Sequence, residues 1–526
     1  MRSVIFGVDG LTFRVLHPLM ERGDLPNFRK LQQEGCEAVL ESKYPPLTPP
    51  AWTSLSTGLR PARHGMYDYW SYADDQDHAI TRSVHVQTRR RGGKAIWNIL
   101  SEYDKQMLVI NVPATYPPET INGIMISGYM TPPNMNVDFT YPTSFKEELF
   151  RIAPSYSLIP GPVFEKHKLK MQVKPMVDVI LRMTEQRTKL IIHLLKEHDW
   201  DLCYLAYIGP DRIQHPLWEE TIALDPRTNE YFYMLDHALG LVLEQLGPDD
   251  TLFVVSDHGF HGHNSYFDIN EYLCKQGLLT LGPSQDKRRK ASKASMVRHV
   301  VTKLGMRQVA RKAKRYLKAS GVWHEPAVDG SRPQLVDVDW DKTLAYVPSF
   351  SGFQGGYADI FLGPEITDEQ IAGLCEDLRR QRDPKNGNPL IDEIFTTEVY
   401  GKGPYEPREP HLLLLPNDGV TFRMDSGNER VWEDIGKTFG SHQKDGVLYA
   451  YGGPFKRGFK TPNAEVFDLV PTLLKAMGLP FPYEFDGRVL DELFVEKQQA
   501  EQVSTVAGDG LEGGLARRKL KKLLEV

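Results

Sequence analysis

The stretch Val4-Ile5-Phe6-Gly7-Val8-Asp9-Gly10 begins the chain with an apolar run that ends in an acid. Three further apolar runs also stand next to acids or histidines. Asp211 and His215 follow residues 202–207, Asp257 and His258 follow residues 252–256, and His442 precedes residues 447–451. Short apolar runs rich in β-branched and aromatic residues are typical of buried strands. The sequence therefore predicts buried strands with chemically active residues at their ends.

Segments with helical periodicity alternate with these runs. Residues 174–197 and 231–246 predict amphipathic helices, and residues 107–112 predict one more buried strand. Such alternation predicts an α/β fold: a three-layer sandwich whose central, mostly parallel sheet has helices on both faces. Functional groups of such sheets gather at the carboxyl ends of the strands, where Asp9, Asp211 and Asp257 stand.

The pattern changes after residue 280, which predicts several units. Residues 1–280 and 431–495 form the predicted catalytic domain. Residues 281–335 form a basic helical insertion, residues 336–430 a smaller α+β insertion, and residues 496–526 a flexible linker with a basic C-terminal helix. The Pro-rich segment 130–170 predicts a long loop over the site.

The composition is that of a globular protein. The 526 residues are 41% hydrophobic and 25% charged, with a net charge of −6. No apolar run approaches the roughly 18 residues of a membrane span, and the first residues lack a signal-peptide pattern, so we expect a cytoplasmic protein. The four cysteines show no Cys-x-x-Cys spacing, which favours reduced thiols.

Positive charge is concentrated in residues 285–320, which hold thirteen lysines and arginines against one acid, Asp286. Two interpretations stay open. One is a solvated helical face; the other is peripheral attachment to an anionic membrane or an acidic partner, to which the basic tail 515–526 would contribute. We expect no nucleic-acid binding, because the whole chain is acidic and no platform of aromatic and basic residues is present.

The acids and histidines predict two metal sites. Asp211 and His215 are one helical turn apart and can reach one ion, with His442 as a third ligand. Asp9, Asp257 and His258 would hold a second ion; Gly259 would allow the turn that lets the last two converge. Carboxylate and imidazole ligands without thiolate suit Zn²⁺, or alternatively Mn²⁺.

Thr48 is the candidate nucleophile. It precedes Pro49, a favoured first helical residue, and Gly58 fits the end of the same helix, so Thr48 is predicted to be the N-cap. The positive helix dipole and a nearby metal would both favour an alkoxide there. A plain capping threonine is the alternative; the metal pattern favours the nucleophile. His261 and His263 are interpreted as surface residues.

These residues resemble the alkaline phosphatase superfamily, in particular its type I phosphodiesterase/nucleotide pyrophosphatase branch and the group of predicted phosphohydrolases or phosphomutases. The resemblance runs in order over residues 1–495. Its motifs are Gly7-Val8-Asp9-Gly10, Pro46-Leu47-Thr48-Pro49-Pro50-Ala51-Trp52-Thr53, Thr57-Gly58-Leu59-Arg60-Pro61, His64-Gly65, Asp211-Arg212-Ile213-Gln214-His215, Ser256-Asp257-His258-Gly259 and Gly440-Ser441-His442.

The resemblance implies a two-metal hydrolase in which Thr48 also contacts the second ion and forms a phospho-threonine intermediate. One departure stands out: nucleotide pyrophosphatases carry an Asn that contacts a phosphoryl oxygen where this chain has Tyr69. The absence of Cys or Ser at position 48 argues against a sulfatase.

The sequence thus predicts a phosphoester hydrolase of the phosphodiesterase or pyrophosphatase type. The alternatives are a phosphomutase of the same superfamily and a membrane-surface protein that binds a phosphorylated lipid or glycan. The substrate itself has no readable motif.

Overall fold

The structure is a computed structural model of the whole chain. It describes residues 1–42, 45–72, 83–85, 88, 91–132, 135–282, 338–348, 356–405, 410–424 and 430–495.

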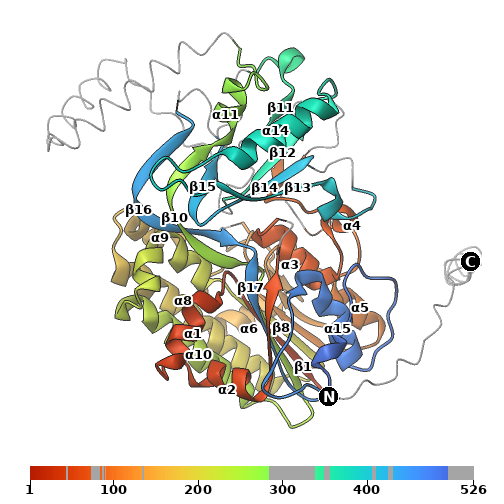
Figure 1. Cartoon of the computed structure of the whole chain (residues 1–526). Helices are drawn as coiled ribbons and strands as arrows, with labels where there is room; N and C mark the ends of the chain where they lie inside the picture. Colours follow the sequence, from red (N-terminus) through yellow and green to blue (C-terminus); the bar gives the residue numbers. More distant parts are fainter. Residues whose placement is uncertain are drawn as a thin grey trace, which may run out of the picture.

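A large central sheet organises the molecule (Figure 1). Its strands, in spatial order, are β18 (Phe459–Lys460), β2 (Cys36–Glu41), β17 (Asp445–Gly452), β9 (Thr251–Val255), β1 (Ser3–Val8), β8 (Leu202–Tyr207), β5 (Met107–Ile110), β6 (Gly123–Ile126) and β7 (Thr140–Tyr141), with β19 (Ala464–Glu465) also paired to β2. Strands β9, β1, β8, β5 and β6 run parallel, while β17 and β7 pair antiparallel with their neighbours. The predicted, mostly parallel sheet is confirmed.

Both faces of this sheet are buried, because successive side chains of a strand point to opposite faces. In β1, Val4, Phe6 and Val8 belong to one hydrophobic core and Ile5 to the other. The first core contains residues of α1 (Phe13–Glu21), α2 (Pro26–Glu34), α6 (Phe145–Ile152), α7 (Gly161–Lys168), α8 (Val173–Glu197), α9 (Gly209–Ile222) and α10 (Pro226–Leu243). The second contains residues of α3 (Thr48–Thr57), α5 (Ile96–Glu102) and α15 (Leu469–Ala476). The three-layer α/β sandwich is therefore confirmed.

A smaller unit stands at one end of the main sheet (Figure 1). It contains a three-stranded sheet of β15 (Gly419–Arg423), β10 (Gly259–Asp268) and β16 (Trp432–Gln443). A four-stranded sheet of β11 (Ala345–Tyr346), β12 (Ala358–Leu362), β14 (Leu412–Pro416) and β13 (Ile391–Thr396) adjoins it, with α11 (Ile269–Lys275) and α14 (Asp368–Arg380). The remaining named elements include α4 (Pro61–His64) and the hairpin of β3 (Trp70–Tyr72) and β4 (Ser83–His85).

The small unit has its own hydrophobic core, and that core reaches beyond the predicted limits of 336–430. Phe267, Leu273 and Leu279, from the segment predicted to be catalytic, pack with Ile360 and Leu414. Strands β10 and β16 also leave the main sheet and pair with β15. Residues on either side of the insertion therefore contribute to the small unit as well.

The helices predicted at 174–197 and 231–246 correspond to α8 and α10. The prediction of a long loop over 130–170 was wrong, since this segment contains β7, α6 and α7. Phe145 and Leu149 of α6 and Phe164 of α7 are buried in the first core. Prolines that punctuate short helices made the segment look irregular.

Several predictions lie outside the described residues: almost all of the basic insertion at 281–335, including the basic segment 285–320, and the tail 496–526 with its C-terminal helix. Among the described helices, none has the length and hydropathy needed to cross a membrane. All four cysteines are free thiols.

Gly7 holds α3 against the sheet, because a Cβ there would lie 2.5 Å from the Trp52 ring. Gly7→Ala should therefore lower the free energy of unfolding by about 2 kcal/mol through overpacking. Urea unfolding followed by tryptophan fluorescence measures this. Gly373→Ala, in α14 with open space around it, is the matched control and should stabilise by about 0.5 kcal/mol. Equal effects of the two substitutions would contradict the argument.

Candidate metal centre

Three adjacent parallel strands bring the acids together. Val8 of β1 is level with Tyr207 of β8, and Gly7 is level with Val255 of β9. The residues that follow these strands therefore emerge at one edge of the sheet. There the Asp211 N–H donates to the carbonyl of Asp9 over 3.2 Å, and the Gly10 N–H donates to Oδ1 of Asp257 over 3.1 Å. These bonds fix the backbone from which the carboxylates project.

His442 reaches the same edge on β16, far along the chain. Its strand packs closely on α9, because a Cβ on Gly440 would lie 2.4 Å from the carbonyl oxygen of Gln214. Glycine thus allows the approach that places His442 beside His215. His442 is fully buried, and His215 is partly exposed.

Asp211, His215 and His442 form a tight cluster. Oδ1 of Asp211 lies 3.1 Å from Nε2 of each histidine, and the two Nε2 atoms are 3.1 Å apart. Ligand atoms of a tetrahedral zinc ion with bonds of about 2.0 Å stand about 3.3 Å apart. The cluster therefore has the dimensions of a metal site.

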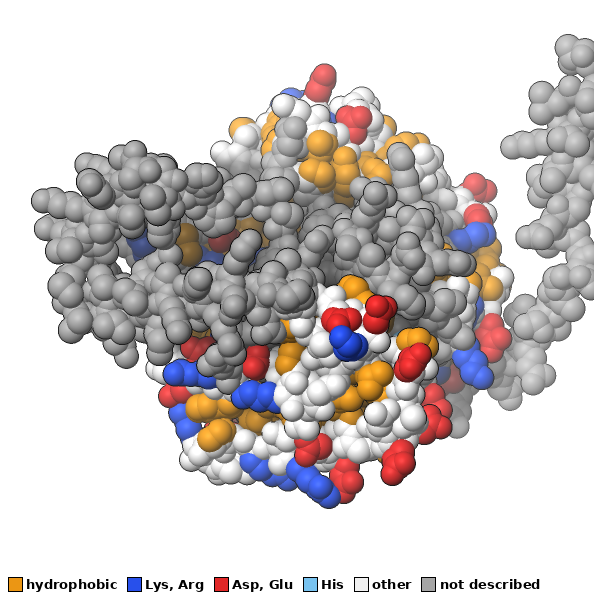
Figure 2. Space-filling model, turned by 90° about the horizontal axis from the view of Figure 1, so that it is seen from above, with side chains coloured by type: hydrophobic (Ala, Val, Ile, Leu, Met, Phe, Trp, Pro, Cys, Tyr) orange, Lys and Arg blue, Asp and Glu red, His pale blue; other side chains and the backbone are white. Residues whose placement is uncertain are grey.

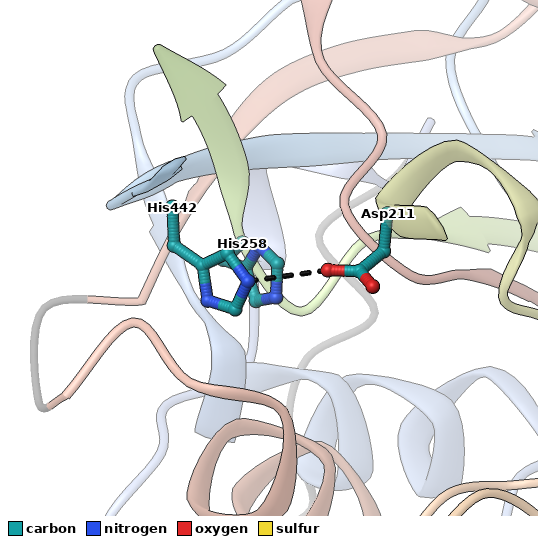
Figure 3. A group of neighbouring side chains, drawn as sticks. All are labelled: Asp211, His258 and His442. Atoms are coloured by element: carbon teal, nitrogen blue, oxygen red, sulfur yellow. Dashed lines mark hydrogen bonds and ion pairs between the residues drawn. The ribbon is translucent and has the colours of Figure 1, made fainter. Parts of the chain in front are cut away.

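His258 joins this cluster to a second group of acids. Its ring stacks on that of His442 with centroids 3.6 Å apart, behind His442 in Figure 3, where Asp211 points toward both rings. Its Nε2 lies 3.5 Å from Oδ1 of Asp9 and 3.3 Å from Oδ2 of Asp257. Two groups could thus hold an ion, Asp211–His258–His442 and Asp9–Asp257–His258. All six predicted ligand residues are brought together, with His258 at the centre.

Hydrogen bonds fix the orientation of all three imidazoles. Nδ1 of His215 donates to the Gly440 carbonyl, Nδ1 of His258 to the Gly259 carbonyl and Nδ1 of His442 to the Pro46 carbonyl, over 3.0, 3.1 and 2.9 Å. Because a carbonyl only accepts, each Nδ1 carries the proton in this arrangement. Each ring then directs its Nε2 atom at the acids, as metal-bound histidines do.

Charge and burial explain the pKa directions. Burial and the neighbouring carboxylates raise the pKa of Asp9 well above its ordinary value, and burial raises that of Asp257. Burial alone would raise the pKa of Asp211, but His215 and Arg212 lower it well below the usual range. Burial lowers the pKa of His258 and brings that of His442 to about 4. His258 and His442 are therefore neutral at pH 7.

Several buried acceptor atoms of these acids and histidines thus lack a hydrogen-bond donor. Both carboxylate oxygens of Asp9, Oδ2 of Asp211 and of Asp257, and Nε2 of His258 are buried without a hydrogen-bond partner among the described residues. Buried polar groups are rarely left unsatisfied. A divalent cation satisfies such a set of oxygens and nitrogens, so these residues fit a metal.

Thr48 stands beside this centre at the start of α3. Leu47, in extended conformation, occupies the N-cap position, so the prediction of Thr48 as N-cap was wrong by one residue. The Thr48 hydroxyl is fully buried and accepts a hydrogen bond of 3.1 Å from the Tyr69 O–H. Pro46, two residues earlier, holds His442. The candidate nucleophile therefore adjoins the metal ligands.

Other sequence interpretations need correction. His261 and His263 are 1% and 7% exposed on β10, so they are not surface residues. Gly259 is needed for close backbone approach rather than for a turn, because a Cβ there would lie 2.1 Å from the Asp445 carbonyl oxygen.

The sequence pattern predicts no function for Arg212, although this residue directly follows the candidate ligand Asp211. Its guanidinium lies over the Tyr129 ring, 4.2 Å from the centroid, and its Nε lies 3.2 Å from Oδ2 of Asp211. The sequence feature that could have indicated a role for Arg212 is its place directly after the candidate ligand Asp211.

The mostly parallel sheet, covered by helices on both faces, carries these carboxylates and imidazoles at its strand ends. The sequence model of the type I phosphodiesterase/nucleotide pyrophosphatase family matches residues 3–445. The chain belongs to that family of phosphoester hydrolases. No curated protein sequence matches it.

Solved structures share the fold at low sequence identity. An inactive variant of murine ectonucleotide pyrophosphatase/phosphodiesterase 5 in complex with AMP is 13% identical, with a TM-score of 0.52 over 94% of this chain and 100% of that one. Phosphonoacetate hydrolase from Sinorhizobium meliloti in complex with phosphonoformate is 13% identical, with a TM-score of 0.56 over 91% and 95%. These likenesses support the fold alone.

Because the acids lie close together, one substitution should stabilise the metal-free protein and also abolish its stabilisation by metal. Asp257→Asn removes an ionisable carboxyl that burial and neighbouring acids destabilise, so it should raise the unfolding midpoint of the metal-free protein by about 2 °C. The same change should abolish the stabilisation by Zn²⁺ or Mn²⁺, about 2.7 kcal/mol for wild type at 100-fold the Kd.

Thermal unfolding with and without a chelator measures both effects. The exposed acid Glu244, changed to Gln, is the matched control and should behave as wild type. Retained metal stabilisation in Asp257→Asn would exclude this residue as a ligand.

Proposed function

We propose that this protein is a two-metal phosphoester hydrolase of the diesterase or pyrophosphatase type that acts through a phospho-threonine on Thr48. The observation that carries the proposal is the common orientation of three histidines, whose Nδ1 atoms bond to backbone carbonyls and whose Nε2 atoms face buried carboxylates. Family membership supports the reaction class. Thr48 lies beside the candidate ligands and accepts a hydrogen bond from Tyr69, which supports its assignment as the nucleophile.

Asp211, His215 and His442 would hold one ion, and Asp9, Asp257 and His258 the other, with Thr48 toward the second. Neutral imidazole and carboxylate ligands suit Zn²⁺, with Mn²⁺ as the alternative. The ions, when bound, supply positive charge that stabilises a Thr48 alkoxide and the leaving oxygen.

The chain's own residues would divide the work. Burial keeps bulk water from the Thr48 hydroxyl, and Tyr69 orients that hydroxyl through its hydrogen bond. Thr48 Oγ1 would form a bond to phosphorus as the bond to the leaving group breaks. Water would then cleave the Oγ1–phosphorus bond, which regenerates threonine and releases the phosphorylated product.

Thr48→Ala should reduce turnover of bis-p-nitrophenyl phosphate by at least about 1,000-fold, because the nucleophile is lost. Thr48→Ser should retain measurable turnover. Thr53→Ala removes another buried hydroxyl from the same helix, one bonded to the Pro49 carbonyl, and should leave turnover unchanged. Full activity in Thr48→Ala would disprove the covalent mechanism.

Two measurements on wild type complete this test. Elemental analysis should give about two metal ions per chain. Hydrolysis in ¹⁸O-labelled water should place solvent oxygen in the phosphate product, whereas a phosphomutase would return the phosphoryl group to substrate without it. Two bound ions without turnover of any phosphoester would favour the alternative function, a membrane-surface protein that binds a phosphorylated lipid or glycan.

We further propose that residues 285–320, with residues 515–526, attach the protein peripherally to anionic membranes, where a lipid-linked or glycan-linked phosphoester would be within reach. Lys, Arg, Asp and Glu side chains are interspersed over the described part of the face in Figure 2, whereas thirteen of the fourteen charged residues in the sequence 285–320 are basic. Mixed charges bind an anionic surface weakly, so the proposal depends on this segment.

Full-length protein should float with phosphatidylserine vesicles at low salt and be released at high salt, because the attraction is screened. A chain lacking residues 285–320 should stay with the soluble fraction. Equal flotation of both proteins would disprove the proposal, as would absence of flotation by the full chain.

A further inference from the structure

Arg212 presents buried N–H groups that nothing in the described part of the chain accepts. Its side chain is 12% exposed, and Nε and Nη2 are both buried without a hydrogen-bond partner. Nε forms an ion pair with Oδ2 of Asp211 over 3.2 Å, and Nη2 has no hydrogen-bond partner among the described residues. A buried donor left unsatisfied costs free energy that a bound acceptor would restore.

Two tyrosine rings connect the Arg212 guanidinium to the candidate nucleophile Thr48. The guanidinium Cζ lies 4.2 Å from the centroid of the Tyr129 ring, and that ring meets Tyr69 edge-on with centroids 6.1 Å apart. The Tyr69 O–H in turn donates to Thr48 Oγ1 over 3.1 Å. The arginine side chain is always protonated in proteins. A cation therefore stands between the candidate ligand Asp211 and the Tyr129 ring, which contacts the tyrosine bonded to Thr48.

We propose that Arg212 binds the non-bridging oxygens of the phosphoryl group that Thr48 attacks. The planar guanidinium offers parallel N–H groups that match two phosphoryl oxygens, which an ammonium cannot do. Tyr69 gives its hydroxyl proton to Thr48 rather than to substrate, so position 69 supplies no amide donor for these oxygens. Arg212 would provide the missing donors, and this inference rests on the proposed function.

The competing explanation is that Arg212 only balances the negative charge of Asp211. Removing a charge-balancing residue would change metal affinity and leave phosphate affinity at full metal occupancy unchanged. Removing a phosphoryl-binding residue would do the reverse. Metal content and phosphate affinity must therefore be measured on the same preparations.

Inorganic phosphate is the probe, titrated calorimetrically into metal-loaded wild type, Arg212→Gln and Arg212→Lys. We expect Arg212→Gln to keep its metals and to bind phosphate about 10- to 100-fold more weakly, the loss typical of a charged hydrogen bond. Arg212→Lys should recover only part of that affinity. Added guanidinium should partly restore phosphate binding in Arg212→Ala.

Arg91→Gln is the matched control. It removes another buried guanidinium, one whose Nη atoms already bind Glu119 and Asn98, so it should change stability without changing phosphate affinity. Unchanged phosphate affinity in metal-loaded Arg212→Gln would overturn the inference, as would metal-loaded wild type that binds no phosphate. Full activity in Thr48→Ala together with weakened phosphate binding in Arg212→Gln would disprove the nucleophile and leave the role of Arg212 standing, so the two proposals can fail separately.

Discussion

Repulsion among three buried carboxylates is the constraint on which the site depends. Asp9, Asp211 and Asp257 follow three adjacent strands, so the fold forces them together at one edge of the sheet. Burial removes the water that would screen them. The neutral imidazoles of His258 and His442 cannot relieve this repulsion, because their Nδ1 protons point away to backbone carbonyls. The cluster of acids and histidines is thus preorganised to bind a metal cation.

Much of the fold was readable from the sequence because local patterns dictate it. The apolar run at 4–8 is typical of a strand buried on both faces, and the spacing along 174–197 is typical of an amphipathic helix; both form. The segment 130–170 was misjudged, since α6 and α7 gain their stability from packing on α8, which no local pattern records. The shared role of β10 and β16 was missed for the same reason: strand pairing is a long-range property.

The site was predictable in its residue types and less so in its arrangement. Acids at strand ends identified Asp9, Asp211 and Asp257, because parallel topology brings those ends together. The central place of His258 between the two groups depends on the stacking of its ring on His442, which spacing cannot reveal. Arg212 and Tyr69 were overlooked as partners because their relation runs through the Tyr129 ring, from a distant segment.

The position of His442 on β16 has a consequence for biosynthesis. This strand comes late in the chain and pairs with β10, so the imidazole is translated after every other candidate ligand. A polypeptide that ends before β16 would contain Asp9, Asp257 and His258 but would lack one member of the Asp211–His215–His442 cluster. That cluster is therefore the last part of the site to be completed during translation.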